Sequence, residues 1–351
     1  MNMINKISIS AIAAATFFSV QVWAGNEDRV GQSGANELII NPWARSAGWM
    51  NCNTSTVRGM EAQYLNVAGT AFTRKTEIGF SHTTWLKGTG ISINSFGISQ
   101  HVGESGAITL GIMSMDFGNI EVTTPDLPEG GIGTFKPQFL NVGLSYAKAF
   151  SNSIYGGLTI KVISESVADV RASGIAFDAG IQYVTGFNKE KDNLRFGISL
   201  KNVGAPLTFK GDGLASKGFT SDNVSLTISQ RAERFELPSL VNIGGSYDFK
   251  LAEMHRITLS AAFTSNSFSR DQTAVGLEYG FKNLFMLRAG YAYERKGASE
   301  DETINVYRGF GAGVTVEAPI GKSGKSIGLD YSYRPTYTFD GTHSFGVLLK
   351  L

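Results

Sequence analysis

The stretch PIGKSGKS, residues 319–326, carries residue types that could hold a phosphate group. A phosphate-binding loop of the form G-x-x-x-x-G-K-S places backbone amides and one lysine around the phosphates and then opens a helix. Here Pro319 stands at the place of the first glycine, and no helical pattern follows Ser326. The stretch is therefore interpreted as a flexible basic turn between two strands.

Other residues that could do chemistry are scattered. His82, His101, His255 and His343 show no H-x-x-x-H spacing, and Cys52 is the single cysteine, so no zinc-ligand pattern is present. No G-x-S-x-G nucleophile elbow occurs, and a hydrolase that uses a serine and a histidine of a barrel wall has no supporting pattern. We expect no enzyme activity, no metal and no cofactor.

The elements that would position these residues show a period of two. In VGLEYGFKNLFMLRAGYAYER, residues 275–295, apolar side chains alternate with glycine and charged side chains on both sides of a short break, which predicts a hairpin. The same pattern recurs along the chain and predicts about fourteen strands, most of them long enough to cross a bilayer. The predicted strands are residues 76–86, 89–101, 105–115, 137–150, 153–165, 170–186, 193–201, 237–250, 255–265, 269–280, 284–295, 305–318, 325–335 and 342–351.

The connections follow the parity of a bacterial outer-membrane barrel, in which tight periplasmic turns alternate with longer external loops. The long segments 116–136, 202–236 and 296–305 are connections three, seven and eleven, and the tight turns after Phe150 and before Leu284 are connections four and ten. The final segment, THSFGVLLKL, is predicted to close the barrel against the first strand, because closure removes the unpaired edge.

The two faces of the strands have different expected surroundings. Rows such as Leu277, Tyr279, Leu287 and Tyr291 are predicted to face lipid, where a charge near the midplane would cost about 2 to 4 kcal/mol. Charged residues of the opposite row are expected inside the barrel, where structural pairing is favoured and a ligand or transport role stays open. These lumenal charges are Glu278, Arg288, Glu294, Glu317, Asp330 and Arg334.

Residues 1–24 have the form of a secretory signal peptide, with Lys6, an apolar run shorter than the roughly 20 residues of a spanning helix, and small residues up to Ala24. Residues 25–75 break the alternation and are expected to form a plug in the lumen, or alternatively to lie free in the periplasm. Residues 76–351 form the predicted barrel. The net charge of +1 gives no reason to expect a nucleic-acid partner.

Four short motifs carry a resemblance to a known family: ARSAG (44–48), YLNVAGTAF (64–72), NVGAPLTF (202–209) and LPSLVNIGGSY (237–247). Together they resemble the PorV/PorQ outer-membrane proteins, whose fold is related to that of the FadL-type fatty-acid transporters. The resemblance implies a fourteen-stranded barrel with an N-terminal plug that serves type IX secretion. Its implied partners are the translocon barrel protein or the C-terminal domains of secreted cargo.

Three functions follow as hypotheses: a partner of secretion machinery in the outer membrane, a FadL-like transporter of hydrophobic small molecules, and a general porin. The glycine-rich lumen and the expected plug argue against the porin. The loop 202–236 is a candidate docking surface, because its apolar content exceeds what a solvated loop needs, although self-packing above the membrane would bury the same residues. Its candidate docking residues are Leu207, Phe209, Leu214, Phe219, Leu226 and Phe235.

Overall fold

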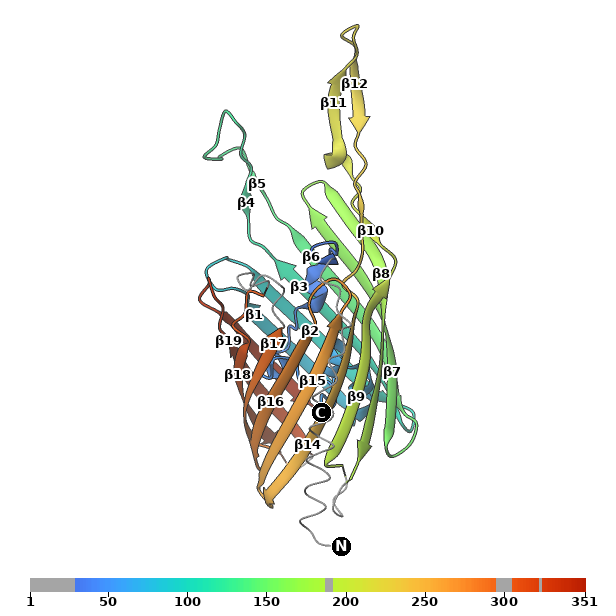
Figure 1. Cartoon of the computed structure of the whole chain (residues 1–351), viewed down its shortest axis with the longest axis vertical. Helices are drawn as coiled ribbons and strands as arrows, with labels where there is room; N and C mark the ends of the chain where they lie inside the picture. The colour runs from blue at the N-terminus through green and yellow to red at the C-terminus, as the bar shows by residue number, and fades with distance from the viewer. Residues whose placement is uncertain (1–28, 187–191, 295–304, 322–323) are drawn as a thin grey trace.

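The protein is a closed antiparallel β-barrel of 14 strands in a computed structural model that describes residues 29–186, 192–294, 305–321 and 324–351. Figure 1 shows the strands tilted around a central axis, with long hairpins extending from one end. The predicted signal peptide, and nearly all of the predicted connection 296–305, lie outside the described residues.

The strand boundaries agree with the predicted ones to within a few residues, and the predicted fold class is confirmed. In chain order the barrel strands are β1 (Thr76–Thr84), β2 (Ser92–Val102), β3 (Gly106–Asp116), β6 (Gln138–Ala149), β7 (Ile154–Val167), β8 (Val170–Thr185), β9 (Leu194–Gly204), β14 (Leu240–Ala252), β15 (His255–Asn266), β16 (Gln272–Phe281), β17 (Phe285–Glu294), β18 (Phe310–Ile320), β19 (Lys325–Arg334) and β20 (Thr342–Lys350).

Closure occurs between the first and the last strand of the barrel. β1 pairs with β20 from Glu77 opposite Lys350 to Thr84 opposite His343. The wall therefore leaves no free edge in the bilayer, where an unpaired backbone group would cost several kcal/mol. Among the described residues, no helix is long and apolar enough to cross a membrane.

The two faces of the wall differ as the period of two requires. Outward side chains are apolar and exposed, as Leu287 and Leu329 show at 46% and 55%, while the inward Arg288 is 3% exposed. This arrangement matches a barrel whose outer surface contacts hydrocarbon and whose interior holds the charges.

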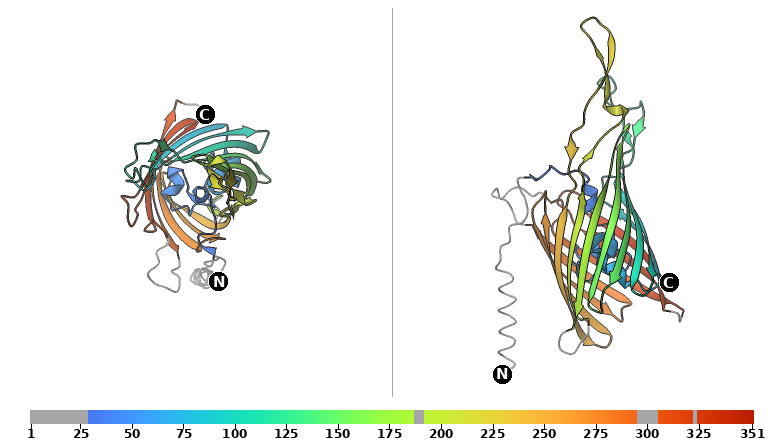
Figure 2. Two further views of the ribbon diagram at one scale, coloured as in Figure 1. Left: turned by 90° about the horizontal axis from the view of Figure 1, so that it is seen from above. Right: turned by 90° about the vertical axis from the view of Figure 1, so that its right-hand side faces the viewer.

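The connections divide the barrel into two ends. One end carries short turns, and the other carries the long segments that Figure 2 shows projecting from the barrel. One projection is built by β4 (Ile120–Glu121) and β5 (Thr134–Phe135), and a longer one by β10 (Leu207–Thr208), β11 (Ala215–Phe219), β12 (Ser225–Ser229) and β13 (Arg234–Phe235), with the short turn η4 (Asp212–Leu214).

The chain ahead of β1 runs inside the barrel, as the view from above in Figure 2 shows. It is built from short helical turns, η2 (Asn36–Ile39), α2 (Ala44–Ala47), α3 (Ala62–Leu65) and η3 (Val67–Phe72), and we call residues 36–73 the lumenal segment. Most of its residues are buried, with Ala47, Cys52, Thr54 and Ala68 at 0% exposure.

Glycines of the wall make room for the lumenal segment. A side-chain carbon at Gly290 would lie 2.3 Å from the carbonyl oxygen of Trp49, and one at Gly48 would lie 3.0 Å from the α-carbon of Gly313. Gly290 also pairs with Gly276 on one side and Gly311 on the other, so the inward glycines form a row around this part of the wall. Backbone of the segment thus packs directly on backbone of the wall.

Candidate functional site

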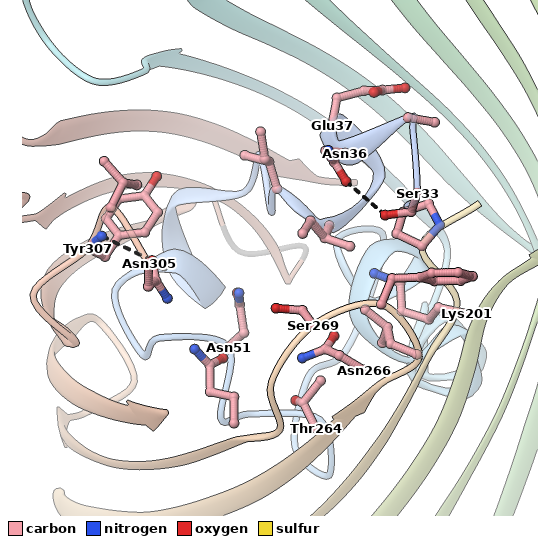
Figure 3. A pocket seen from close by; sticks show the side chains of 18 of the residues that line it. Ser33, Asn36, Glu37, Asn51, Lys201, Thr264, Asn266, Ser269, Asn305 and Tyr307 are labelled. Atoms are coloured by element: carbon pink, nitrogen blue, oxygen red, sulfur yellow. Dashed lines mark hydrogen bonds between the residues drawn. The ribbon is translucent and has the colours of Figure 1, made fainter. Parts of the chain in front are cut away.

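A cavity of about 730 Å³ lies in the lumen, at the end from which the long connections extend. Figure 3 shows it bounded by the lumenal segment and by the strands of the wall. Residues of the lumenal segment such as Ile40, Asn51 and Tyr64 line it, together with residues at the loop-side ends of the strands, such as Met115 and Thr264. Its volume suits a small organic molecule.

One side of the cavity is apolar and aromatic. Trp85, Met115, Phe117 and Phe139 line it and pack in one cluster with Ile40 of the lumenal segment. The rings of Phe117 and Phe139 meet edge to face with their centroids 4.8 Å apart. This surface offers apolar contact area to a ligand without a hydrogen-bonding requirement.

Polar side chains from β14 to β17 supply further parts of the lining. Thr264 donates a hydrogen bond to Asn242 at 2.7 Å, and Gln272 donates one to Glu294 at 3.2 Å. Asn305 also donates to Glu294, at 2.7 Å. These lining groups are hydrogen-bonded to one another, so they can orient a ligand while remaining satisfied without one.

Two basic side chains stand over aromatic rings in the cavity lining. The Nζ of Lys201 lies 3.8 Å from the ring centroid of Tyr64, whose hydroxyl donates to the carbonyl of Leu38 at 2.7 Å. The guanidinium of Arg334 lies 4.6 Å from the ring centroid of Tyr307. Burial raises the pKa of the Tyr64 hydroxyl well above its usual range, so this hydroxyl stays a donor.

Tyr307 joins Arg334 to the apolar side of the cavity, because its hydroxyl accepts a hydrogen bond from the indole of Trp85 at 3.0 Å. Nε and Nη2 of Arg334 have no hydrogen-bond partner among the described residues, and the residue is 4% exposed. A cation therefore adjoins an apolar wall at this point of the cavity.

The predicted lumenal charges fall into three places. Glu294 and Arg334 line the cavity. Glu278 and Arg288 pair at 2.9 Å, and Asp330 lies 3.8 Å from Arg288. Glu317 pairs with Lys350 at 2.8 Å, near the short-turn end.

The lumenal segment contributes Arg45 to this network, at 3.2 Å from Asp330. Glu61, also of the segment, lies 3.8 Å from Arg45, and burial raises its pKa to about 7 although the charge of Arg45 opposes the shift. Sequence reasoning had not singled out either residue, because they lie in the stretch without strand periodicity. Lys201 of the cavity lining was not singled out either. It lies in the inward row of β9, so the alternation of that strand could have identified it.

The candidate docking residues divide by burial. Leu207 is 3% exposed and packs with Leu38, while Phe209 and Phe235 pack together with ring centroids 5.5 Å apart. Leu207 is therefore buried at the base of the projection, while Phe209 and Phe235 are half-buried there. Phe219 and Leu226 are 69% and 49% exposed on the β11–β12 ribbon, and Leu214 is half-buried at its base.

The histidines and the cysteine occupy separate places. His82 contacts Asn94 at 2.8 Å, His255 contacts Tyr279 at 2.7 Å, and Cys52 is fully buried. Among the described residues, no group of three His, Cys, Asp or Glu side chains could hold a metal ion. In PIGKSGKS, Pro319 pairs with Ser326 across the β18–β19 turn, and residues 322–323 lie outside the described residues.

Comparison with solved structures identifies the fold. The barrel is similar to a deletion mutant of the TodX monoaromatic hydrocarbon channel, with a TM-score of 0.55 at 12% identity over 87% of this chain and 96% of that chain. It is also similar to a Pseudomonas aeruginosa FadL homologue, with a TM-score of 0.53 at 12% identity over 89% and 97% of the two chains.

The Pseudomonas putida toluene transporter TodX gives a TM-score of 0.53 at 12% identity over 84% of this chain and 93% of that chain. No protein-family profile matches the sequence, and no curated protein matches it. At this identity the likeness concerns architecture alone. The chain is therefore a membrane-spanning β-barrel of the outer-membrane type with a FadL-like fold.

Proposed function

We propose that the protein admits hydrophobic small molecules through the outer membrane and binds them first in the lumenal cavity. The observation that carries this proposal is the cavity itself, with an aromatic wall beside polar and cationic groups. Burying an apolar ligand against Trp85, Met115 and Phe139 would contribute about 25 cal/mol for each Å² removed from water. The FadL-like neighbours, which include a toluene transporter and a monoaromatic hydrocarbon channel, support transport over catalysis.

Passage beyond the cavity depends on the lumenal segment. This segment packs on the wall through close contacts such as Trp49 against Gly290, so a bound molecule advances only when the segment shifts. Its helical turns are short, of four to six residues, and are held by tertiary contacts rather than by helix propensity. A local displacement of the segment therefore needs no unfolding of the barrel.

Filling the cavity tests the proposal. Thr264→Trp places an indole in the cavity, whereas Thr273→Trp places the same side chain on the exposed outer face of the adjoining strand. We expect binding of radiolabelled toluene to the purified protein to fall at least about tenfold in Thr264→Trp and to stay at the wild-type level in Thr273→Trp. Equal binding by both variants, or no binding by the wild type, would exclude the cavity as the site.

A second candidate function is a role in type IX secretion, in which the barrel binds the translocon barrel protein or the C-terminal domains of secreted cargo. The observation that favours it is the β11–β12 ribbon, which projects far from the barrel and exposes Phe219, Leu226 and Ile228. Large apolar side chains on a protruding element are typical anchors of a protein interface.

Deleting residues 215–229 removes the whole ribbon, and its ends already meet because the amide of Gln230 donates to the carbonyl of Leu214 at 2.9 Å. A deletion of residues 210–222 is less suitable, because it would remove β11 and leave β12 without its partner strand. We expect the deletion of 215–229 to leave the barrel folded and to abolish co-purification with a secretion partner. As a control, deleting 123–132 trims the other projection, whose stem is closed by Val122 and Gly133. Unchanged co-purification after the first deletion would rule out the ribbon as the docking surface.

A further inference from the structure

Three oxygen-bearing side chains meet, away from solvent, where the lumenal segment reaches the wall. Glu37 of η2 lies against Glu165 of β7 and Asn141 of β6. The three residues are 3%, 4% and 7% exposed. Glu37 and Glu165 also line the lumenal cavity, so the cluster adjoins a space that can hold water.

The oxygens of this cluster are poorly supplied with hydrogen-bond donors, because only the Asn141 side chain and the backbone of Glu37 and Ala35 approach the carboxylates. Both carboxylate oxygens of Glu37, Oε1 of Glu165 and Oδ1 of Asn141 are buried without a hydrogen-bond partner among the described residues. Buried polar atoms are nearly always satisfied, and a buried acceptor left alone costs about 1 to 3 kcal/mol. Four such atoms in one place indicate that a positively charged or hydrogen-bearing species belongs between them.

Neighbouring lysines do not fill this role. Lys161, on the same strand as Glu165, pairs with Asp178 at 2.8 Å and with Asn202 at 2.5 Å. Lys201 stands over the ring of Tyr64. Neither lysine is among the groups that neutralise Glu37.

We propose that Glu37, Asn141 and Glu165 form a binding site for a divalent cation, and that the cation is Ca²⁺. The metal ligands would all be hard oxygens, from two carboxylates and one amide. Such oxygens suit Ca²⁺, whereas zinc and copper favour nitrogen and sulfur ligands. Ca²⁺ takes about six to eight oxygen ligands. The side chains supply four of them, and water in the adjoining cavity can supply the rest. Mg²⁺ fits less well, because it demands near-octahedral geometry and holds its waters tightly.

A shared proton is the competing explanation for the same cluster. Burial, and then the charge of Glu165, raises the pKa of Glu37 to about 8, so this carboxyl keeps a proton at neutral pH when no cation is present. Ca²⁺ has to displace that proton, because only the ionised carboxylate is a good ligand.

A cation at this place would fasten the outer part of the lumenal segment to the wall. Glu37 belongs to the segment and lies 128 positions before Glu165 in the chain, so one ion would join two elements that the backbone does not join. The adjoining contacts are apolar, with Leu38 in a cluster with Ile163 and Leu207. The ion would thus control how firmly η2 closes one side of the cavity, whichever molecules the cavity accepts.

Calorimetric titration of the full-length protein in detergent with CaCl₂ tests this site. We expect one Ca²⁺ per chain with a dissociation constant of roughly 10⁻⁴ to 10⁻³ M, the range of extracellular calcium modules, and weaker binding of Mg²⁺. Glu37→Gln and Glu165→Gln should each weaken Ca²⁺ binding at least about tenfold. The matched control is Glu294→Gln, since Glu294 lines the same cavity but is already hydrogen-bonded to Gln272 and Asn305.

Asn141→Asp gives a result that a folding defect cannot imitate. It adds a third carboxylate to the cluster, so Ca²⁺ should bind more tightly and should raise the thermal midpoint by more than in the wild type. If neither the wild type nor Asn141→Asp binds Ca²⁺ at 10 mM, the proposal is overturned. A Glu37→Gln variant that is then as stable as the wild type would assign the cluster to a shared proton.

Discussion

At the scale of single residues, the interior of the barrel holds charges that are matched by partners from different strands. Arg288 has a side chain with 0% exposure, and it contacts Glu278 at 2.9 Å and Thr315 at 2.7 Å. Arg256 contacts Glu278 at the same distance of 2.9 Å. Because several partners share each charge, removal of one cation leaves the carboxylates partly compensated.

Arg288→Leu should lower the free energy of unfolding by about 3 kcal/mol, near the lower end of the range for breaking a buried ion pair, because Glu278 keeps Arg256. The measurement is the temperature at which the compact band on an unboiled gel is lost. Lys282→Leu, in an exposed turn, is the control and should leave that temperature unchanged. A double variant with Glu278→Leu should regain part of the loss, and an unchanged midpoint in the single variant would show that the pair contributes nothing.

At the scale of elements, the fit between the lumenal segment and the wall depends on glycine. The row of Gly276, Gly290 and Gly311 crosses three neighbouring strands, and side-chain carbons there would meet Cys52, Trp49 and Met50. A wall without these glycines would hold the segment farther from the strands and would open gaps elsewhere in the lumen.

Gly290→Ala should therefore displace the segment without breaking the wall, since the new methyl group lies 2.3 Å from the Trp49 carbonyl oxygen. We expect a loss of about 1 to 3 kcal/mol, typical of overpacking, and faster reaction of Cys52 with a thiol reagent while the barrel stays folded. Gly245→Ala is the matched control, because its nearest contact is an ordinary 3.7 Å to Phe196. Equal Cys52 reactivity in both variants would contradict the direct packing.

At the scale of the whole molecule, the barrel is a wall with a filled interior and a cavity near one end. The lumenal segment supplies the floor of that cavity, and the projections extend beyond it. Access to the interior is therefore expected from the end with the long connections, and the segment limits access from the other end.

A cysteine at Ser46 should report this filling, because Ser46 is 1% exposed and accepts a hydrogen bond from Asn53 at 2.9 Å. In a Cys52→Ser background, Ser46→Cys should resist a membrane-impermeant maleimide in intact outer membranes and also after the membranes are broken open. Ser221→Cys, exposed near the end of the β11–β12 ribbon, should react at once. Rapid labelling of Ser46→Cys from both sides would mean that the segment does not fill the barrel.

Strand number, strand boundaries and closure were predictable from the sequence alone. Alternation with a period of two is a local property, because each strand must present one face to hydrocarbon and one to the lumen wherever it lies in the barrel. The same reasoning predicts that Glu278, Arg288 and Asp330 belong to the inward rows. Short motifs carried the resemblance to a secretion family, and that role stays a prediction, since the fold is shared with hydrocarbon channels.

The cavity and the oxygen-bearing cluster beside it were decided only by the tertiary structure. Glu37, Asn141 and Glu165 come from a helical turn and two strands, and no sequence spacing relates them. The packing of Leu207, Phe209 and Phe235 likewise depends on where the projection folds back onto the barrel mouth, which the apolar character of these residues does not specify. Alternation specifies which side of the wall a residue faces, whereas the neighbour it meets across the lumen depends on closure of the barrel around the segment inside it.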